Sequence, residues 1–166
     1  KGKSYKSVLV WSEGGVGDQI LFLRVLNYLQ KENIQIYVYL DEKLNKLLEL
    51  SFPKIVFLNN LNLDKIESQI AQGDLCKIYI SNKKDLIESS RPYLVSNKKL
   101  TNQLKVKLPK NKIICGISWS SKNIGFGDNK SINLEKLKDI LLLPNIVFVD
   151  LQYGDKKKEK ENIWIK

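Results

Sequence analysis

Histidine and methionine are absent from the 166 residues of the chain, and cysteine occurs only at Cys76 and Cys115. Without histidine or a Cys-x-x-Cys pair, the sequence has none of the ligand spacings of a zinc site, and we expect no metal and no cofactor. The two isolated cysteines lie in apolar, strand-like runs. They predict buried free thiols in a reducing compartment, with a disulfide between them as the alternative.

Long apolar runs are also missing. The longest, Ile20–Leu29, is interrupted by Arg24 and Asn27 and is shorter than the roughly 18–20 residues of a membrane-spanning helix. The start of the chain leads into only a short apolar stretch, unlike a signal peptide. We therefore expect a cytoplasmic protein. Because the chain opens with Lys1 and has no methionine, we also expect a piece of a longer protein.

Arginine is almost absent from a basic chain. Its 28 Lys and Arg residues exceed 18 Asp and Glu residues by a net charge of +10, yet Arg24 and Arg91 are the only arginines. Arginine is the residue that forks onto guanine edges and phosphates. The dense basic run at 156–160 is broken by Glu159 and continues into Glu161. These features favour a solvated charged surface over a nucleic-acid patch, and we expect no specific nucleic-acid partner.

The remaining composition, 43 % hydrophobic and 28 % charged, is that of a globular protein. In the first part of the chain, short apolar runs alternate with amphipathic segments, which predicts an α/β fold with a Rossmann-like parallel sheet. The predicted strands are Ser7–Ser12, Asn33–Leu40, Pro53–Leu58 and Leu75–Ile80. The predicted helices are Gln19–Lys31, Glu42–Leu50 with Asp41 as N-cap, and Asp64–Gln72 with Gly73 past its end.

The pattern restarts after a polar stretch, so we expect a second domain of the same kind. We predict an N-terminal domain at 1–94, a connector at 95–110 and a partial C-terminal domain at 111–166. The second domain would contain strands at Lys112–Trp119 and Asn145–Leu151, a loop at Ser120–Lys130, a helix at Asn133–Leu142 and the start of a further strand at Asn162–Ile165.

Two turns between a strand and a helix are candidate binding sites. The first contains Gly14, Gly15, Gly17 and Asp18, and glycines there let a ligand approach backbone N–H groups at a positive helix end. It lacks the spacing of dinucleotide-binding and P-loop motifs. A tight turn without a ligand, with Asp18 as a favourable charge at the helix start, is the alternative.

The second turn brings hydroxyls, lysines and backbone amides into one loop, a combination that suits a diphosphate. The alternative is that its lysines are solvated and that Ser131 lies in the N-cap region of the next helix. The candidate residues are Ser118, Ser120, Ser121, Lys122, Lys130 and Ser131.

Taken together, these segments resemble a known family. The segment Val8–Arg24, with its Glu-Gly-Gly-Val-Gly-Asp turn, resembles the opening of the heptosyltransferase-like glycosyltransferases, especially the bacterial version that follows tetratricopeptide repeats. Arg91–Leu94 resembles a short motif before the second domain of that group. The segments Ile113–Ser121, Lys130–Ile132 and Phe148–Gly154 resemble the start of its donor-binding domain. The similarity extends over nearly the whole chain.

The resemblance implies a GT-B architecture, with an acceptor-side domain and a domain that binds a nucleotide-diphosphate sugar. It implies that Asp18 is the general base and that Ser120, Ser121 and Lys130 hold the diphosphate. The sugar would pass to a glycan, lipid-linked or protein acceptor with inversion and without a metal. The donor domain of the family continues further and contains a histidine, so the resemblance also implies that these 166 residues alone are inactive.

Two other interpretations stay open. One is a non-catalytic module that binds a nucleotide-sugar or a protein, in which a truncated second sheet is covered by homodimerisation. The other is a nicotinamide oxidoreductase, in which Asp41 at the end of the second predicted strand would hold a ribose.

Overall fold

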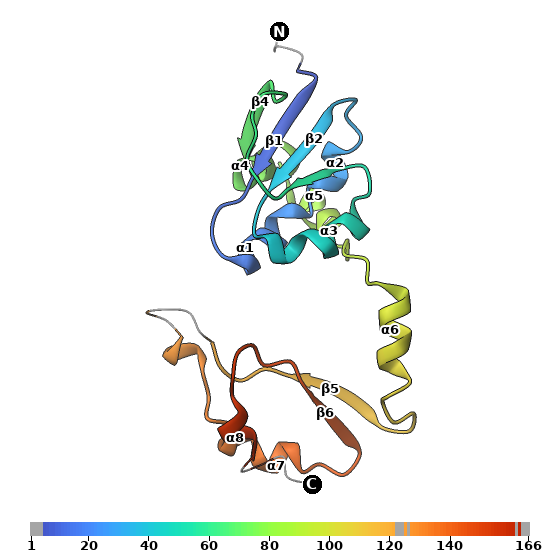
Figure 1. Ribbon diagram of the computed structural model, residues 1–166, viewed down its shortest axis with the longest axis vertical. Coiled ribbons are helices and arrows are strands. Elements are labelled where there is room, and N and C mark those ends of the chain that lie inside the picture. The colour runs from blue at the N-terminus through green and yellow to red at the C-terminus, as the bar shows by residue number, and fades with distance from the viewer. Residues whose placement is uncertain (1–4, 122–124, 126, 162, 164–166) are drawn as a thin grey trace. The chain divides into compact units, whose positions relative to one another are not determined.

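The computed structural model describes residues 5–121, 125, 127–161 and 163. The chain divides into two compact units, Lys1–Thr101 (unit 1) and Asn102–Lys166 (unit 2), which are described separately (Figure 1). Both units contain a parallel sheet, so the predicted α/β class is confirmed.

Unit 1 contains a four-stranded parallel sheet in the order β3-β2-β1-β4. Its central strand β1 pairs with β2 in the register Val8↔Ile36 and with β4 in the register Val8↔Ser68. After β3 the chain crosses back to the other side of β1, so the β1–β4 boundary is the point where the strand order reverses. In sheets of this kind, ligands bind beyond the carboxyl ends of the strands at that boundary. The strands are β1 (Ser7–Trp11), β2 (Gln35–Tyr39), β3 (Val56–Leu58) and β4 (Ser68–Ala71).

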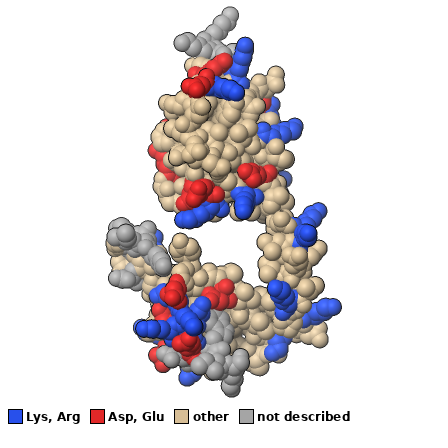
Figure 2. Space-filling view, viewed as in Figure 1, with Lys and Arg blue, Asp and Glu red and all other residues tan. Residues whose placement is uncertain are grey.

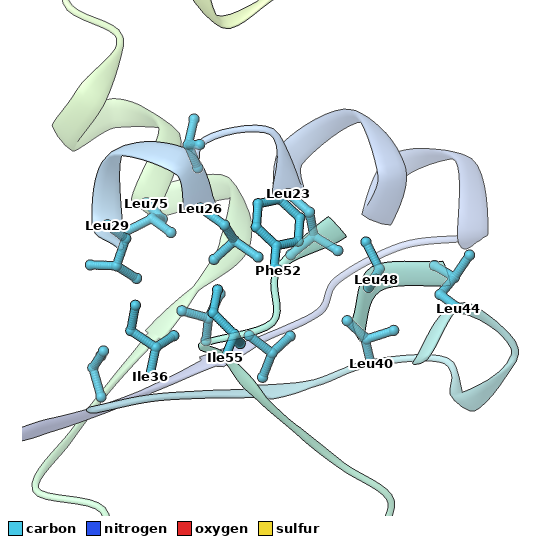
Figure 3. Packing of buried hydrophobic residues seen from close by; sticks show 14 residues of the cluster. Leu23, Leu26, Leu29, Ile36, Leu40, Leu44, Leu48, Phe52, Ile55 and Leu75 are labelled. Carbon is cyan, nitrogen blue, oxygen red and sulfur yellow. The ribbon is translucent and has the colours of Figure 1, made fainter. Parts of the chain in front are cut away.

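The core of unit 1 lies between one face of this sheet and its helices (Figure 3). Alternate residues of β1 and β2 face the helices, because successive side chains of a strand point to opposite faces. These residues pack against leucines from α1, α2, α3 and α4 and against Phe52. The helical elements are α1 (Val16–Leu23), α2 (Leu26–Leu29), the 3-10 turn η1 (Glu42–Leu44), α3 (Asn45–Ser51), α4 (Gln72–Tyr79) and α5 (Lys83–Ser89).

The prediction for residues 64–80 was wrong. Ser68–Ala71, expected within a helix, is strand β4, and Gln72–Tyr79, expected to contain a strand, is helix α4. In α4, Leu75 is buried in the core and the Tyr79 ring stacks on Tyr28 with 5.7 Å between centroids and 15° between planes. The apolar residues of this segment therefore cover the sheet as one face of a helix, while the shorter, more polar segment before them pairs with β1.

The other predicted helices of unit 1 are present with shorter or divided extents. The single helix expected over Gln19–Lys31 is divided into α1 and α2 by Arg24 and Val25. Asp41 is confirmed as an N-cap, since its side chain accepts a hydrogen bond of 3.0 Å from the Lys43 N–H. It caps the 3-10 turn η1, and α3 follows directly.

Unit 2 is built on two parallel strands, β5 (Ile113–Ile117) and β6 (Ile146–Asp150), in the register Ile113↔Ile146. Among its described residues, only Trp119 and Leu134 are buried hydrophobic side chains. The strand expected at Asn162–Ile165 lies outside the described residues except for Ile163, which is in a turn. The remaining elements are α6 (Lys98–Lys105), which contains the boundary between the units, the 3-10 turns η2 (Asp128–Lys130) and η3 (Leu134–Leu137), and the helices α7 (Lys138–Leu141) and α8 (Lys157–Glu161).

The basic run at 156–160 lies on and just before α8, in a region where Lys and Asp or Glu side chains are mixed (Figure 2). Lys156 pairs with Glu159 at 2.7 Å, and Lys160 pairs with Asp150 at 2.8 Å. None of the described helices is long and apolar enough to cross a membrane.

Both cysteines are free thiols, but the expectation of two buried thiols in strands was wrong. Cys115 is in β5 and exposed, while Cys76 is in α4 and partly buried.

Candidate functional site

The glycine turn follows β1 at the carboxyl edge of the sheet and leads directly into α1. Gly14 has φ = 75°, a left-handed conformation that favours glycine. Gly15 is the N-cap of α1 and provides no side-chain cap for the first-turn amides. Gly17 and Asp18 are the second and third residues of the helix, and all four residues are exposed.

The Asp18 carboxylate is held by the turn itself. Its Oδ2 accepts a hydrogen bond of 3.0 Å from the Gly15 N–H, while the Gly15 carbonyl accepts one of 3.0 Å from Gln19 N–H. A Cβ on Gly14 would lie 2.7 Å from the same oxygen. Because glycine has no side chain, position 14 leaves room for the Asp18 carboxylate. Among the described residues, no group donates to Oδ1 of Asp18.

Two buried glutamines hold the turn from opposite sides, and the sequence analysis missed both. Gln19, from α1, donates to the Gly14 carbonyl at 3.3 Å and accepts from the Asp41 N–H at 3.0 Å. Gln72, the first residue of α4, donates to the Glu13 carbonyl at 2.9 Å. The turn is thereby tied to the end of β2 on one side and to the end of β4 on the other. Gln72 was hidden because it was placed at the end of a predicted helix.

This arrangement suits a hydroxyl substrate better than a phosphate. The positive end of α1 attracts anions, but the Asp18 carboxylate already lies there and would repel a second negative charge. A carboxylate with one oxygen fixed and the other available can accept a proton from a hydroxyl group. The turn is therefore a candidate site for proton abstraction. Asp41, the residue of the oxidoreductase interpretation, uses its carboxylate to cap η1.

In unit 2, Gln152 fills the turn that follows β5. Its Oε1 accepts from the N–H groups of Trp119 and Ser120, both at 2.9 Å, and from the Ser118 hydroxyl at 3.2 Å. Its Nε2 donates to the carbonyls of Ser120 and Tyr153 at 2.9 and 2.8 Å. The amides expected to be free for a diphosphate are thus already paired within the protein. Gln152 was also missed, although it lies in the segment Phe148–Gly154 that carried part of the family resemblance.

Ser131 closes the same loop. Its hydroxyl accepts from the Ser121 N–H at 2.9 Å and donates to the Gly127 carbonyl at 2.6 Å. The N-cap of η3 is Asn133, whose side chain accepts from the Glu135 N–H at 2.9 Å. Ser131 is therefore a loop-closing residue and does not cap the following helix itself.

The loop presents one described lysine, Lys130, which is exposed at the end of η2. Lys122 lies outside the described residues. The structure thus brings Ser118, Ser120, Ser121 and Ser131 together around Gln152 and the Ser121–Ser131 bond. Gly14, Gly15, Gly17 and Asp18 are brought together in unit 1.

Trp119 connects this loop to α8. Its indole Nε1 donates to a Glu159 carboxylate oxygen at 2.8 Å, and the other oxygen accepts from Lys156 at 2.7 Å. The hydrogen bonds from Lys156 and Trp119 lower the pKa of Glu159. Within the part of the chain that the structure describes, no cluster of three or more Cys, Asp or Glu side chains could hold a metal ion.

Comparisons of the chain with family models, with curated proteins and with solved structures found no match. The heptosyltransferase-like identity therefore stays a prediction.

Proposed function

We propose that the chain is a glycosyltransferase-like protein, or a part of one, that moves a sugar from a nucleotide-diphosphate sugar to a hydroxyl of a glycan, a lipid-linked sugar or a protein. In this proposal, units 1 and 2 are the acceptor-side and donor-side domains of a GT-B architecture. The observation that carries it is the exposed Asp18 carboxylate at the carboxyl edge of the sheet, fixed through Oδ2 by the Gly15 N–H.

The reaction would be inverting and metal-independent. Asp18 Oδ1 takes the proton of the acceptor hydroxyl while the hydroxyl oxygen bonds to the anomeric carbon. The bond from that carbon to the diphosphate oxygen breaks on the opposite face. Lys130 and the hydroxyls of Ser120 and Ser121 stabilise the negative charge that develops on the leaving diphosphate.

Gly17 gives further support to a substrate at the start of α1. Its backbone does not have the positive φ that requires glycine, and a Cβ added there would meet no atom within 4 Å. Glycine in the interior of a helix is unfavourable relative to alanine by roughly 1 kcal/mol, and Gly17, in the first turn of α1, carries part of this cost. Packing within unit 1 does not explain this cost, whereas close approach of a substrate to the backbone does.

A cytoplasmic location is part of this proposal, because an exposed thiol such as Cys115 suits a reducing compartment.

Calorimetric titration of the protein that contains this chain with nucleotide-diphosphate sugars tests donor binding. Lys130→Ala should weaken binding, whereas Lys136→Ala, which removes an exposed lysine of η3, should not. Asp18→Asn should leave donor affinity unchanged. If the folded protein that contains this chain binds none of these nucleotides, the proposal is refuted.

Transfer is measured in the protein that contains this chain, by release of nucleoside diphosphate. Asp18→Asn should reduce it by about 10²- to 10⁴-fold, the usual contribution of a general base. Asp85→Asn is the matched control, because Asp85 is also the third residue of a helix but α5 follows no strand of the sheet. Equal rates for Asp18→Asn and Asp85→Asn would remove Asp18 as the base.

A non-catalytic binding module is the second candidate, and the Gln152 contacts favour it. Because Gln152 occupies the amides of Trp119 and Ser120, a diphosphate would bind there only after displacing it. In this alternative, unit 2 presents its two-stranded sheet to a protein partner or a second copy of the chain. Donor binding without transfer, in the protein that contains this chain, would support this module over the enzyme.

A further inference from the structure

The only two arginines of the chain, Arg24 and Arg91, line the same pocket of unit 1. Arg24 directly follows α1, and Arg91 follows α5. The pocket has a volume of about 320 Å³ and lies between the C-terminal half of α1 and residues 89–94. This volume is at the lower end of the range typical of small-molecule sites.

The pocket is held in shape by bonds that do not involve the arginines. The Tyr93 hydroxyl donates to the Ile20 carbonyl, one of the last four carbonyls of α1, which lack partners within a helix. The Tyr93 ring packs on Phe52, with 5.6 Å between centroids. The Ser51 hydroxyl oxygen accepts from the Val95 N–H at 2.9 Å. The segment 89–95 is thereby attached to α1 and to the end of α3.

The two guanidinium groups have no acidic partner among the described residues. Arg24 Nη1 donates to the Ser90 hydroxyl at 3.3 Å, while its Nε is buried without an acceptor. An adjoining hollow shares both arginines and adds Lys31 and Glu88. With three cations and one carboxylate, the two hollows together have a positive balance.

The rest of the pocket is apolar. Its walls include Ile20, Leu21, Pro92, Tyr93 and Leu94, and the Leu21 and Leu94 side chains are 48 % and 36 % exposed. A ligand that matches both parts has an oxyanion for the arginines and an apolar body for the leucines. Arginine side chains suit tetrahedral phosphate oxygens, because each guanidinium offers several donors in a fixed plane.

We propose that this pocket binds an organic phosphate ester that has an apolar group, with the phosphate between Arg24 and Arg91 and the apolar group against Leu21 and Leu94. The proposal does not depend on sugar transfer, because neither Asp18 nor any residue of unit 2 takes part. The phosphate ester could be a free small molecule or a lipid headgroup, and the test separates these two sources.

The test is calorimetric titration of the chain with hexyl phosphate, hexanol and inorganic phosphate, together with sedimentation with vesicles of phosphatidylcholine that contain phosphatidic acid. Hexyl phosphate should bind at least about 10-fold more tightly than either half alone. Arg91→Gln should weaken it by about 10-fold or more, the usual effect of losing a hydrogen bond to a charged group. Lys99→Gln, which removes an exposed lysine of α6, is the matched control. Arg91 is exposed, so its replacement should leave the melting temperature unchanged.

The proposal is supported if hexyl phosphate binds and its binding depends on Arg91, with or without vesicle binding. If vesicle binding also depends on Arg91, the phosphate ester is a lipid headgroup. Leu94→Asn, a neutral change that removes only the apolar surface, is a second variant and should weaken hexyl phosphate binding while leaving inorganic phosphate unaffected. The proposal fails if hexyl phosphate does not bind, if Arg91→Gln and Lys99→Gln bind it equally, or if inorganic phosphate binds as tightly as hexyl phosphate.

Discussion

Replacing Gly14 by alanine is expected to lower the free energy of unfolding of unit 1 by about 2–3 kcal/mol. The backbone contributes the first part, because an L-residue at φ = 75° costs roughly 1–2 kcal/mol. The new Cβ contributes the second, because it would lie 2.7 Å from Asp18 Oδ2. The carboxylate would have to move and give up its bond to the Gly15 N–H. A bond to a charged group is worth about 1.5–3 kcal/mol when shielded, and we take about 1 kcal/mol here because Asp18 is exposed.

The neighbouring glycines are matched controls. Gly15 has φ = −80°, and its added Cβ would come no closer than 3.8 Å to Asp18, so Gly15→Ala should cost only about 0.5–1 kcal/mol, the difference between glycine and alanine at an N-cap. Gly17→Ala adds a side chain in open space within a helix and should stabilise unit 1 by up to about 1 kcal/mol. Under the proposed function, the same substitution should weaken substrate binding.

Urea unfolding followed by circular dichroism measures all three variants, and a double-mutant cycle separates the two contributions to Gly14→Ala. With Asp18 also replaced by alanine, only the backbone cost should remain, so the coupling between positions 14 and 18 should be about 1 kcal/mol. The reasoning is refuted if Gly14→Ala costs no more than Gly15→Ala. If the coupling energy between positions 14 and 18 is zero, the steric part of the reasoning is refuted, because the absence of a side chain at Gly14 would then not matter for the Asp18 carboxylate.

Three other predictions concern single side chains. Tyr93→Phe should destabilise unit 1 by about 1 kcal/mol through loss of the bond to Ile20. Burial raises the pKa of Tyr93 to about 12, so the stabilisation by its hydroxyl is complete below about pH 10 and is lost as the pH rises to about 12. The difference in urea midpoint between the unchanged protein and Tyr93→Phe should therefore become smaller between about pH 10 and pH 12. Gln152→Leu removes the oxygen that accepts from the Trp119 and Ser120 N–H groups, and it should destabilise unit 2 by about 1–3 kcal/mol with faster hydrogen exchange at these amides. Unchanged exchange would contradict this role of Gln152. The pKa of Glu159 is lowered, so its stabilising bonds with Trp119 and Lys156 are present above its ordinary pKa and are lost as the pH falls through the lowered value. In a variant in which the other two tryptophans are replaced by Phe, the fluorescence of Trp119 should therefore change with a midpoint below pH 4.5.

The strands that were predicted best from the sequence are those whose side chains are most deeply buried on the sheet face that the helices cover. β2 alternates Ile36 and Val38 toward the core, and this period is visible without a partner. β4 lacks such a signal because it is a four-residue edge strand in which Ser68 and Gln69 are not buried. Its position is determined by pairing with β1, and the intrinsic strand propensity of these four residues gives no information about that pairing.

The polar contacts that fix the candidate loops were the hardest to predict. The Gly14 turn and Asp18 could be predicted because several glycines lie close together between a predicted strand and a predicted helix. Gln72 lies 59 residues from the carbonyl that it binds, and Gln152 lies 32 residues from Ser120. A glutamine in a sequence does not reveal a partner at such a distance, so its role appears only once the strands are paired.

The distribution of buried side chains has a practical consequence for protein production. Sixteen of the buried hydrophobic residues lie in unit 1, against Trp119 and Leu134 in the described part of unit 2. A two-stranded parallel sheet with so small an interior is a weak folding unit. Expression trials should therefore begin with a shortened gene that ends at Thr101, and its product should give a well-dispersed amide spectrum without the rest of the chain.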